Sequence, residues 1–381
     1  MLLNGRKWLV MALGILLAAC KTTLPPPAVP SAPAFTVSKW EMLPDWQSIN
    51  LAMSWPAFLE SCDALKNRPY WQDICVAAAQ VPPDDSSAQR AFYQQWFVPY
   101  QLFNADGSDQ GLITGYYEPQ LHGSRVKTRR YRYPLYGVPD DLLTIDLSDV
   151  YPQLKGMRLR GRLEGNRVVP YYDRAAIDAR PRSLKGHVLF WVDNAVDLFF
   201  LQVQGSGRIE LPDGTLVKVG YANQNGYPYV SIGRKLVEMG EMTLDQASMQ
   251  SIKDWAEKNP DKLAALLEQN PSYVFFRELP DGLDGPIGAL GVPLTEEYSL
   301  AVDRSIVPLG APVFLATTKP DSNVPLNRLM LAQDTGGAIK GGVRADFFWG
   351  FGDPAGEQAG RMKQQGKMWV LFPKGAEPAL N

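Results

Sequence analysis

Residues 334–346 read DTGGAIKGGVRAD, a glycine-rich stretch with an aspartate at each end. The apolar run at 329–333 comes directly before it, and this order predicts a strand that leads into a turn. Glycines in such a turn adopt positive φ angles without strain and let a ligand approach the backbone closely. The stretch therefore predicts a β-rich C-terminal region in which Asp334 and Asp346 lie around one turn.

Asp346 is the strongest candidate for a general acid. Three aromatic residues, 347–349, follow it in the sequence, and partial desolvation among aromatic side chains would raise its carboxyl pKa toward the working pH. Negative charge on Asp334, or on Asp303 if the fold brings it close, would raise that pKa further. Asp334 itself is interpreted first as a residue that caps the glycine turn.

The triplet Asp334-Thr335-Gly336 also matches the signature of aspartic proteases. That chemistry needs two carboxylates that share a proton, and the chain has no second Asp-Thr-Gly or Asp-Ser-Gly triplet, although a homodimer could supply one. A peptidase is therefore the weaker interpretation. Two histidines, His122 and His187, leave few ways to build a zinc site or a base-activated nucleophile. We expect carboxylate chemistry with no metal and no cofactor.

The overall composition is that of a turn-rich globular protein of 381 residues, enough for two or three domains of about 150 residues. Charged residues make up 20% of the chain, below the usual share of about 25%, and it has 33 glycines and 31 prolines. The formal net charge of -2 provides no positive field for nucleic acid. The basic residues from Arg125 to Arg132 are interpreted as a solvated strand face or a contact for acidic peptide or lactyl groups.

Residues 1–19 resemble the signal peptide of a bacterial lipoprotein. Arg6 and Lys7 precede an apolar run that ends in Leu-Ala-Ala-Cys at Cys20 and is too short to span a membrane. We expect cleavage before Cys20 and lipidation of that residue, so that acyl chains hold the protein to the membrane. An ordinary secretory signal with a chance cysteine is the alternative.

A proline-rich tether is expected over residues 20–39. Its prolines predict an extended chain of about 3.1 Å per residue; they are Pro25, Pro26, Pro27, Pro30 and Pro33. The residue after Cys20 is Lys21 and not Asp, which in bacterial lipoproteins resembles sorting to the outer membrane. We therefore expect a periplasmic protein that is anchored to the outer membrane by lipid.

Two cysteines, Cys62 and Cys75, remain once Cys20 is lipidated. Export places them in a compartment that permits disulfides, and the loop between them is short. We predict a bridge, with two buried free thiols as the alternative, because a sequence does not give the Cα separation that a disulfide requires.

Apolar spacing predicts where the helices lie. Two or three short helices are expected between Trp55 and Phe103, and two more over 249–257 and 262–269. Thr243 and Gln246 have capping-box spacing ahead of 249–257. The pair Asp353-Pro354 is expected to begin a last helix.

Short apolar or alternating runs between turn residues predict the strands. The expected strands are 189–192, 198–204, 215–221, 300–302, 313–316, 329–333 and 368–372.

These motifs, taken in order over roughly residues 110–375, resemble the membrane-bound lytic murein transglycosylase A family, which cleaves the glycan strands of peptidoglycan. Each motif is weak alone, but the ordered set is specific. The motifs are Gly115-Tyr116-Tyr117-Glu118-Pro119, Val203-Gln204-Gly205-Ser206-Gly207, Ser231-Ile232-Gly233, Asn270-Pro271-Ser272-Tyr273-Val274-Phe275-Phe276, Asp303-Arg304-Ser305-Ile306 with Pro308 and Gly310, and the stretch 334–346.

The resemblance implies a mainly β fold with peripheral helices. A double-psi β-barrel domain with N-terminal helices would comprise residues 40–124 and 285–381. A smaller β-barrel domain with two helices would be inserted over 125–284. A long groove between the two domains would hold the glycan.

Matching motifs also carry residue roles from the family. Asp346 corresponds to the family's single catalytic acid, and Asp303 and Asp334 resemble the other two aspartates of its three-Asp signature. Five residues in or beside groove-forming motifs are expected to contact the glycan: Thr114, Tyr116, Gln204, Ser206 and Lys340.

The implied reaction is non-hydrolytic cleavage of the β-1,4 bond between N-acetylmuramic acid and N-acetylglucosamine. Asp346 would act first as acid and then as base, and a 1,6-anhydro end would result. Cell-wall synthesis enzymes are candidate partners. Two alternatives stay open: a hydrolase that activates water with Asp303 or Asp334, or a non-catalytic lipoprotein that binds peptidoglycan.

Overall fold

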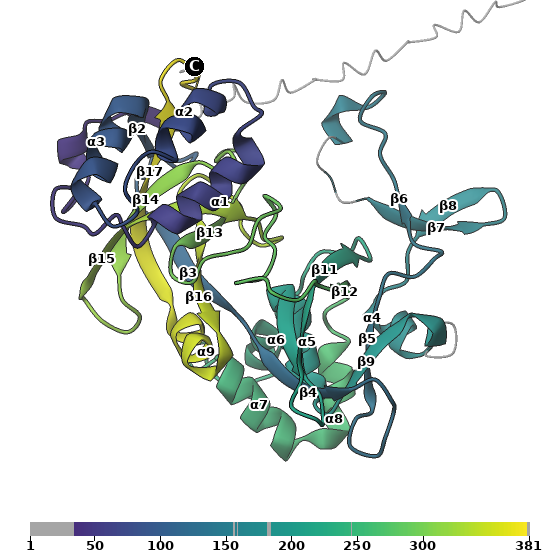
Figure 1. Ribbon diagram of the computed structural model, residues 1–381. Helices are drawn as coiled ribbons and strands as arrows, with labels where there is room; N and C mark the ends of the chain where they lie inside the picture. The colour runs from purple at the N-terminus through teal and green to yellow at the C-terminus, as the bar shows by residue number, and fades with distance from the viewer. Residues whose placement is uncertain (1–33, 155–156, 158, 181–183, 245, 379–381) are drawn as a thin grey trace, which may run out of the picture. The chain divides into compact units, whose positions relative to one another are not determined.

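The computed structural model describes residues 34–154, 157, 159–180, 184–244 and 246–378 (Figure 1). The predicted signal peptide, Cys20 and most of the predicted tether lie outside these residues. Among the described helices, none has the length and apolar character needed to cross a membrane.

Six strands close into a barrel. The pairing order is β17-β14-β15-β13-β16-β3, and β3 pairs back with β17. The β13–β15 and β16–β3 pairs are parallel, and the other pairs in the ring are antiparallel. These strands are β3 (Gly111–Glu118), β13 (Ser299–Val302), β14 (Pro312–Thr318), β15 (Pro325–Asp334), β16 (Ala345–Phe351) and β17 (Lys363–Pro373). Closure leaves no unpaired edge in the ring.

Strand alternation fills the barrel. Successive side chains of a strand point to opposite faces, so Ala345, Phe347 and Trp349 of β16 join one buried cluster with Leu300 and Val302 of β13. The next helix, α9 (Gly352–Arg361), packs its alanines against the same cluster. Two more strands, β1 (Phe35–Val37) and β2 (Phe97–Leu102), extend the sheet from β17.

Three N-terminal helices, α1 (Trp55–Leu65), α2 (Trp71–Ala78) and α3 (Ser86–Trp96), cover the outside of β14, β15 and β17 (Figure 1). A short 3-10 helix, η1 (Trp40–Met42), precedes them. Aromatic rings dominate the interface, where Trp55 and Phe58 share a cluster with Phe314 of β14. Cys62 and Cys75 form a disulfide between α1 and α2, with 5.4 Å between their Cα atoms. The prediction of two or three short helices is confirmed, with three observed; the last of them ends at Trp96 because β2 follows at once.

A second sheet of six strands lies between β3 and β13 in the sequence. Its order is β12-β11-β10-β4-β9-β5, and a bridge from Gly137 to Phe276 joins the two edge strands into a small barrel. The strands are β4 (Gln120–Ser124), β5 (Tyr133–Tyr136), β9 (Val188–Val192), β10 (Ser206–Glu210), β11 (Leu216–Gln224) and β12 (Val274–Glu278). The predicted boundaries between the two barrels remain a prediction.

The inserted region also carries helices and a small third sheet. The sheet comprises β6 (Leu143–Thr144), β7 (Arg160–Glu164) and β8 (Arg167–Pro170). The helical segments are η2 (Pro152–Leu154), α4 (Arg174–Asp178), η3 (Lys185–His187), α5 (Ala195–Gln204), α6 (Ile232–Glu238), α7 (Met249–Lys258) and α8 (Pro260–Leu267).

One strand prediction is wrong. Residues 198–204 belong to the helix α5, which Asn194 caps by accepting hydrogen bonds from two backbone N–H groups and Gly205 ends in the left-handed conformation. A continuous apolar run fits a buried strand as well as a buried helix. The cap residues, Asn194 and Gly205, carry the signal for a helix.

Smaller corrections concern helix starts and the basic segment. Ser248 caps α7, whereas the capping-box pair Thr243 and Gln246 closes an earlier turn. The last helix begins at Gly352, so Asp353 lies inside its first turn. Residues 125–132 form a connection between β4 and β5 and not a strand face; within it, Arg125 pairs with Glu278 and Arg130 pairs with Asp193.

Candidate active site

Asp334, Ala301, Asp346 and Thr114 form one row across four neighbouring strands. Ala301 of β13 lies opposite Asp334 on β15 and opposite Asp346 on β16, and Asp346 lies opposite Thr114 on β3. Neighbouring strands are about 4.8 Å apart, so the backbones of the two aspartates are separated by roughly 10 Å. The fold thus brings together residues that are far apart in the sequence.

The carboxyl group of Asp346 accepts a hydrogen bond from the neighbouring strand β3. The Thr114 hydroxyl donates to Oδ1 of Asp346, and the same hydroxyl oxygen accepts a bond of 2.9 Å from Nη2 of Arg344. Arg344 also donates to the backbone oxygen of Ala345. The guanidinium group therefore fixes the orientation of the threonine hydroxyl, which in turn points its proton at Asp346.

Burial raises the pKa of Asp346, and the hydrogen bond from Thr114 and the positive charge of Arg344 oppose that rise only in part. The aromatic environment differs from the prediction. Phe347 and Trp349 point to the opposite face of β16, into the barrel core. Phe348 alone shares the face of Asp346, and its ring packs 5.1 Å from that of Tyr116.

Asp334 lies at the end of β15, with both carboxyl oxygens occupied. Oδ2 accepts a bond of 3.1 Å from the Tyr116 hydroxyl, and Oδ1 accepts one of 3.0 Å from the backbone N–H of Ala289. Burial raises the pKa of Asp334 to about 6, and the negative charge of Asp346 adds to this. Its hydrogen bonds, including one from the backbone of Thr335, act in the opposite direction.

Asp303 follows β13 and binds the glycine turn. Its Oδ1 accepts from the hydroxyl and the backbone N–H of Ser305, and its Oδ2 accepts a bond of 3.0 Å from the N–H of Gly341. Nζ of Lys340, an exposed side chain, lies 4.0 Å from Oδ1. Burial alone would raise the pKa of Asp303, but these hydrogen bonds and the lysine charge outweigh it and lower that pKa. Asp303 is therefore ionised and anchors the turn.

Gln204 and Ser206 belong to the inserted region. Gln204 ends α5, and its Oε1 accepts a bond of 3.1 Å from the backbone N–H of Tyr117 in β3. Ser206 begins β10 and is buried. Of the five predicted glycan contacts, Thr114 lies in the aspartate row and Tyr116 donates a hydrogen bond to Asp334 of that row. Lys340 lies beside Asp303, and Gln204 and Ser206 lie outside the row.

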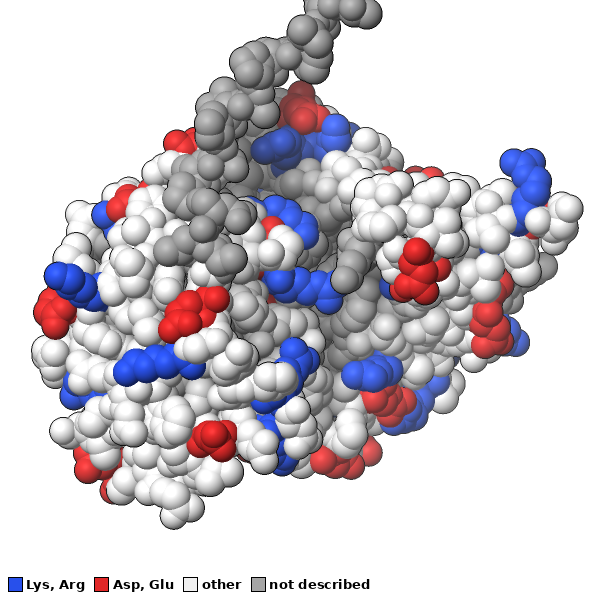
Figure 2. Space-filling model, turned by 90° about the horizontal axis from the view of Figure 1, so that it is seen from above, with Lys and Arg blue, Asp and Glu red and all other residues white. Residues whose placement is uncertain are grey.

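Charge is mixed on one face of the molecule. Lys and Arg side chains and Asp and Glu side chains are both scattered over the face shown in Figure 2. Among the described residues, no group of three or more His, Cys, Asp or Glu side chains is arranged to hold a metal ion.

Comparison with known proteins gives the family of this chain. Residues 112–277 match the family described as MltA specific insert domain, and residues 298–372 match the 3D domain. Membrane-bound lytic murein transglycosylase A of Escherichia coli K12 is 36% identical over 279 residues, which cover 71% of this chain and 68% of that protein. The chain belongs to the lytic murein transglycosylase A family.

Solved structures of this family have the same fold. MltA from Neisseria gonorrhoeae, in its monoclinic form, is 43% identical, with a TM-score of 0.79 and coverage of 91% of this chain and 94% of that one. A membrane-bound lytic murein transglycosylase from Agrobacterium tumefaciens is 32% identical, with a TM-score of 0.79 and coverage of 90% and 98%. E. coli MltA with bound chitohexaose is 28% identical, with a TM-score of 0.66 and coverage of 89% and 94%.

Membership in the lytic murein transglycosylase A family confirms the predicted fold class. The match to the 3D domain covers β13 to β17 and identifies their barrel as the double-psi type. The match to the insert domain covers the second β unit.

Sequence reasoning assigned no role to Arg344, which orients Thr114. The signal for it is its position two residues before Asp346 and directly ahead of β16, because alternation along an extended chain places side chains i and i+2 on the same side. A second unrecognised feature is the ion pair between Glu118, at the end of β3, and Arg208 of β10, whose Nε lies 2.8 Å from Oε2 of Glu118. Glu118 is fully buried, and burial raises its pKa despite the arginine.

Proposed function

We propose that this chain cleaves the β-1,4 bond between N-acetylmuramic acid and N-acetylglucosamine in peptidoglycan without water, leaving a 1,6-anhydro end. Membership in the lytic transglycosylases makes the chain an enzyme of the lyase class. The observation that carries the proposed mechanism is the buried carboxyl of Asp346 held by Thr114, with a raised pKa. The chito-oligosaccharide bound to E. coli MltA supports a glycan as ligand.

In the first step, Asp346 acts as a general acid. Because its Oδ1 accepts from Thr114, the other oxygen, Oδ2, carries the proton. That proton passes to the oxygen that links the two sugars, and the bond from this oxygen to C1 of the muramyl sugar breaks. The electron pair leaves with the oxygen, and the muramyl ring becomes oxocarbenium-like.

In the second step, the ionised Asp346 acts as a base. It takes the proton of the C6 hydroxyl of the same muramyl sugar, and the C6 oxygen forms a bond to C1. The carboxyl regains its proton, and no water is consumed. One carboxyl suffices because the nucleophile belongs to the substrate and therefore has a high effective concentration.

Asp303 and Asp334 support the site in this proposal. A hydrolase would need one of them as a base that activates water. Both carboxyl groups have each oxygen engaged by a protein hydrogen-bond donor. Asp303 holds the glycine turn, and Asp334 fixes Tyr116, so these contacts favour supporting roles and a single catalytic acid.

We further propose that lipid on Cys20 anchors the enzyme to the outer membrane, with residues 20–39 as a tether. The family name, membrane-bound lytic murein transglycosylase A, supports membrane association. The glycan would lie in a groove beside Thr114 and Tyr116, and cell-wall synthesis enzymes stay candidate partners.

The deciding experiment is mass spectrometry of the fragments released from purified peptidoglycan. The proposal expects anhydro ends; a hydrolase would give products about 18 Da heavier through addition of water. Asp346→Asn should fold like the wild type, checked by circular dichroism, and release no anhydro product. Full activity of this variant would remove Asp346 from the mechanism. If the wild type binds peptidoglycan but releases no fragments from it, the protein is a non-catalytic peptidoglycan-binding protein.

A further inference from the structure

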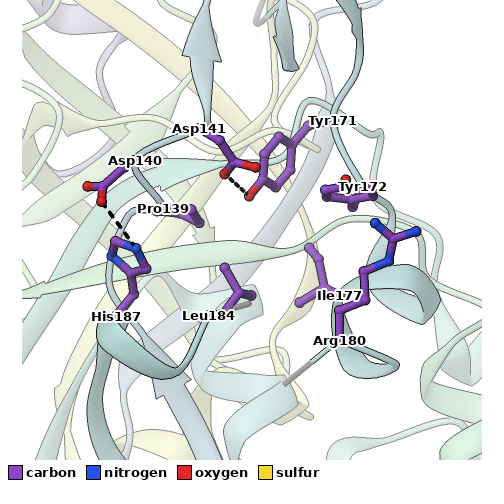
Figure 3. A pocket seen from close by; sticks show the side chains of 9 residues that line it. All are labelled: Pro139, Asp140, Asp141, Tyr171, Tyr172, Ile177, Arg180, Leu184 and His187. Carbon is purple, nitrogen blue, oxygen red and sulfur yellow. Dashed lines mark hydrogen bonds and ion pairs between the residues drawn. The ribbon is translucent and has the colours of Figure 1, made fainter. Parts of the chain in front are cut away.

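A cavity of about 250 Å³ lies in the inserted region, where three connections meet: the segment after β5, the segment between β8 and α4, and the residues around η3 (Figure 3). The Tyr171 hydroxyl donates a bond of 2.8 Å to Asp141. Nε2 of His187 lies 3.6 Å from Oδ2 of Asp140, and the Arg180 side chain is engaged as well. These contacts occupy the charged groups that line the cavity, and they favour a structural role for it.

A β-bulge near the end of β16 decides where Phe351 points. Phe348 lies opposite Tyr116 of β3. Phe351 comes three residues later, yet it lies opposite Glu118, which is only two residues beyond Tyr116. The extra residue reverses the alternation of side chains. Phe351 therefore shares a face with Tyr116 and Asp346, whereas an unbroken strand would turn it into the barrel core.

Gly350 makes the bulge possible. Its φ angle is 97°, in the left-handed region that favours glycine. A Cβ atom at this position would lie 2.3 Å from the carboxyl carbon of Glu296. The bulge therefore depends on a glycine immediately before Phe351.

The Phe351 ring rests on a cation that is held in place. The guanidinium carbon of Arg208 lies 3.6 Å from the ring centroid. Nε of Arg208 donates a bond of 2.8 Å to Oε2 of Glu118, which is fully buried. Breaking a buried pair leaves an uncompensated charge, so Arg208 keeps this position. Arg208 covers one face of the ring, and 46% of Phe351 is exposed, so the other face is open to a ligand.

Phe351 is an isolated exposed ring and not part of an apolar patch. It is the only large apolar side chain that is exposed between residues 325 and 378. A protein partner would need a broad surface, because a stable interface buries about 800 Å² on each side. A sugar needs only one ring, because the apolar C–H face of a pyranose packs on an aromatic face while its polar groups stay in water.

The open ring lies along β3 from the candidate catalytic acid. Thr114 is opposite Asp346, and Glu118 is opposite Phe351. Thr114 and Glu118 are four residues apart on one strand, which is about 13 Å, and they point to the same face. A glycan chain that has one bond at Asp346 and extends along β3 would bring a further sugar over Phe351.

We propose that Phe351 is a stacking site for an N-acetylhexosamine unit of the glycan chain, at a distance from the bond that is cleaved. Arg208 and Glu118 are positioning residues that hold the ring from below. The inference rests on the proposed function, because it places the cleaved bond of the same chain at Asp346. The stacking site would bind the glycan, and the aspartate row would act on it.

Calorimetry with the full-length protein in detergent tests the stacking. Every protein carries Asp346→Asn so that the ligand stays intact, and the probe is chitohexaose, the oligosaccharide bound to E. coli MltA. Phe351→Leu keeps an apolar side chain but removes the ring, so it should weaken binding about tenfold. Phe351→Tyr keeps the ring and should bind within about twofold of the Asp346→Asn parent.

Tyr151→Ala is the matched control. Tyr151 is exposed to a similar extent, 50%, but lies on neither β3 nor β16. Its loss should leave the affinity for chitohexaose unchanged. Unfolding in urea checks that each variant folds, and the comparison of Phe351→Leu with Phe351→Tyr remains decisive because both keep a large side chain at the bulge.

Kinetics on peptidoglycan, with Asp346 restored, give a second readout. Phe351→Leu should raise KM about tenfold and leave kcat near the wild-type value, because a distant sugar contact is the same in the ground state and the transition state. A substitution that only loosened β16 would disturb Asp346 and lower kcat instead.

The two proposals fail in different ways. If the wild type produces no anhydro ends but the parent binds chitohexaose in a ring-dependent manner, the proposed function fails and the stacking site stands. Equal affinity of Phe351→Leu and Phe351→Tyr for chitohexaose would overturn the stacking site, whatever products the wild type releases. Absence of chitohexaose binding by the parent would overturn it as well.

Discussion

Thr114 and Asp346 lie opposite each other on the parallel strands β3 and β16, and the Thr114 hydroxyl donates a hydrogen bond to the Asp346 carboxyl. In the proposed mechanism, this bond decides which carboxyl oxygen of Asp346 carries the proton of the general acid. It also stabilises the ionised carboxylate, so it lowers the pKa of Asp346 against the effect of burial.

Thr114→Val removes the hydroxyl and keeps the shape of the side chain. A hydrogen bond to a charged group contributes about 1.5–3 kcal/mol, so kcat should fall roughly 10- to 100-fold. Thr114→Ser keeps the hydroxyl and should retain most of the activity. The measurement is the rate of release of soluble fragments from peptidoglycan, and equal rates for Val and Ser variants would contradict a role for the hydroxyl.

Arg344→Gln removes a positive charge that lowers the pKa of Asp346. The pKa should rise in this variant, and a general acid works below its own pKa, so the alkaline limb of the kcat/KM profile should move to higher pH. Arg344→Lys keeps the charge and should leave the limb near its wild-type position. A limb that moves to lower pH in Arg344→Gln would show that the charge acts on another group.

Asp334 should make the fold less stable as the pH rises. Its pKa is about 6 in the folded chain, above the ordinary value of about 3.9 for an unfolded aspartate. The unfolded chain releases this proton first, so the stability from protonated Asp334 is complete below about pH 4 and is lost as the pH rises through 6. The loss is at most about 1.4 kcal/mol per pH unit.

Asp334→Asn cannot titrate, yet it keeps an oxygen for the N–H of Ala289. The free energy of unfolding in urea, measured for both proteins between about pH 4 and pH 7, isolates the contribution of this carboxyl as their difference. The wild type should lose stability relative to Asp334→Asn over that interval. A constant difference would mean that the pKa of Asp334 is the same in the folded and unfolded chains.

Arg208→Met should destabilise the junction between β3 and β10. The substitution leaves the fully buried Glu118 without its cation, which costs about 3 kcal/mol of unfolding free energy. Arg125→Met, which breaks the exposed pair with Glu278, is the control and should cost no more than about 1 kcal/mol. Equal losses in the two variants would contradict a special role for the buried pair.

The sequence predicted the aspartates more fully than their surroundings. Asp303, Asp334 and Asp346 are marked by local motifs. The apolar runs predicted the strands before Asp303 and Asp334, but not β16, which carries Asp346. No role was predicted for Arg344, because its partner Thr114 lies 230 positions earlier in the chain. The prediction that three aromatic side chains surround Asp346 is wrong for Phe347 and Trp349. Successive side chains of a strand point to opposite faces, so these two lie on the face opposite Asp346.

The fold could be predicted where the local signals agree. Strands with turn residues on both sides, such as β11 and β14, were found, whereas the apolar run at 198–204 is a helix, because strand and helix share that pattern. The cavity between Asp140 and Arg180 had no sequence signal, because three separate connections meet to form it.

Thr114 and Asp346 are 232 positions apart, and the whole inserted region lies between them. A chain that is delivered from its N-terminus therefore exposes the threonine long before the aspartate. An incomplete chain that ends before β16 contains Thr114 but not Asp346, so it has no complete candidate site. The order of the strands thus leaves the site incomplete until nearly all of the chain is present.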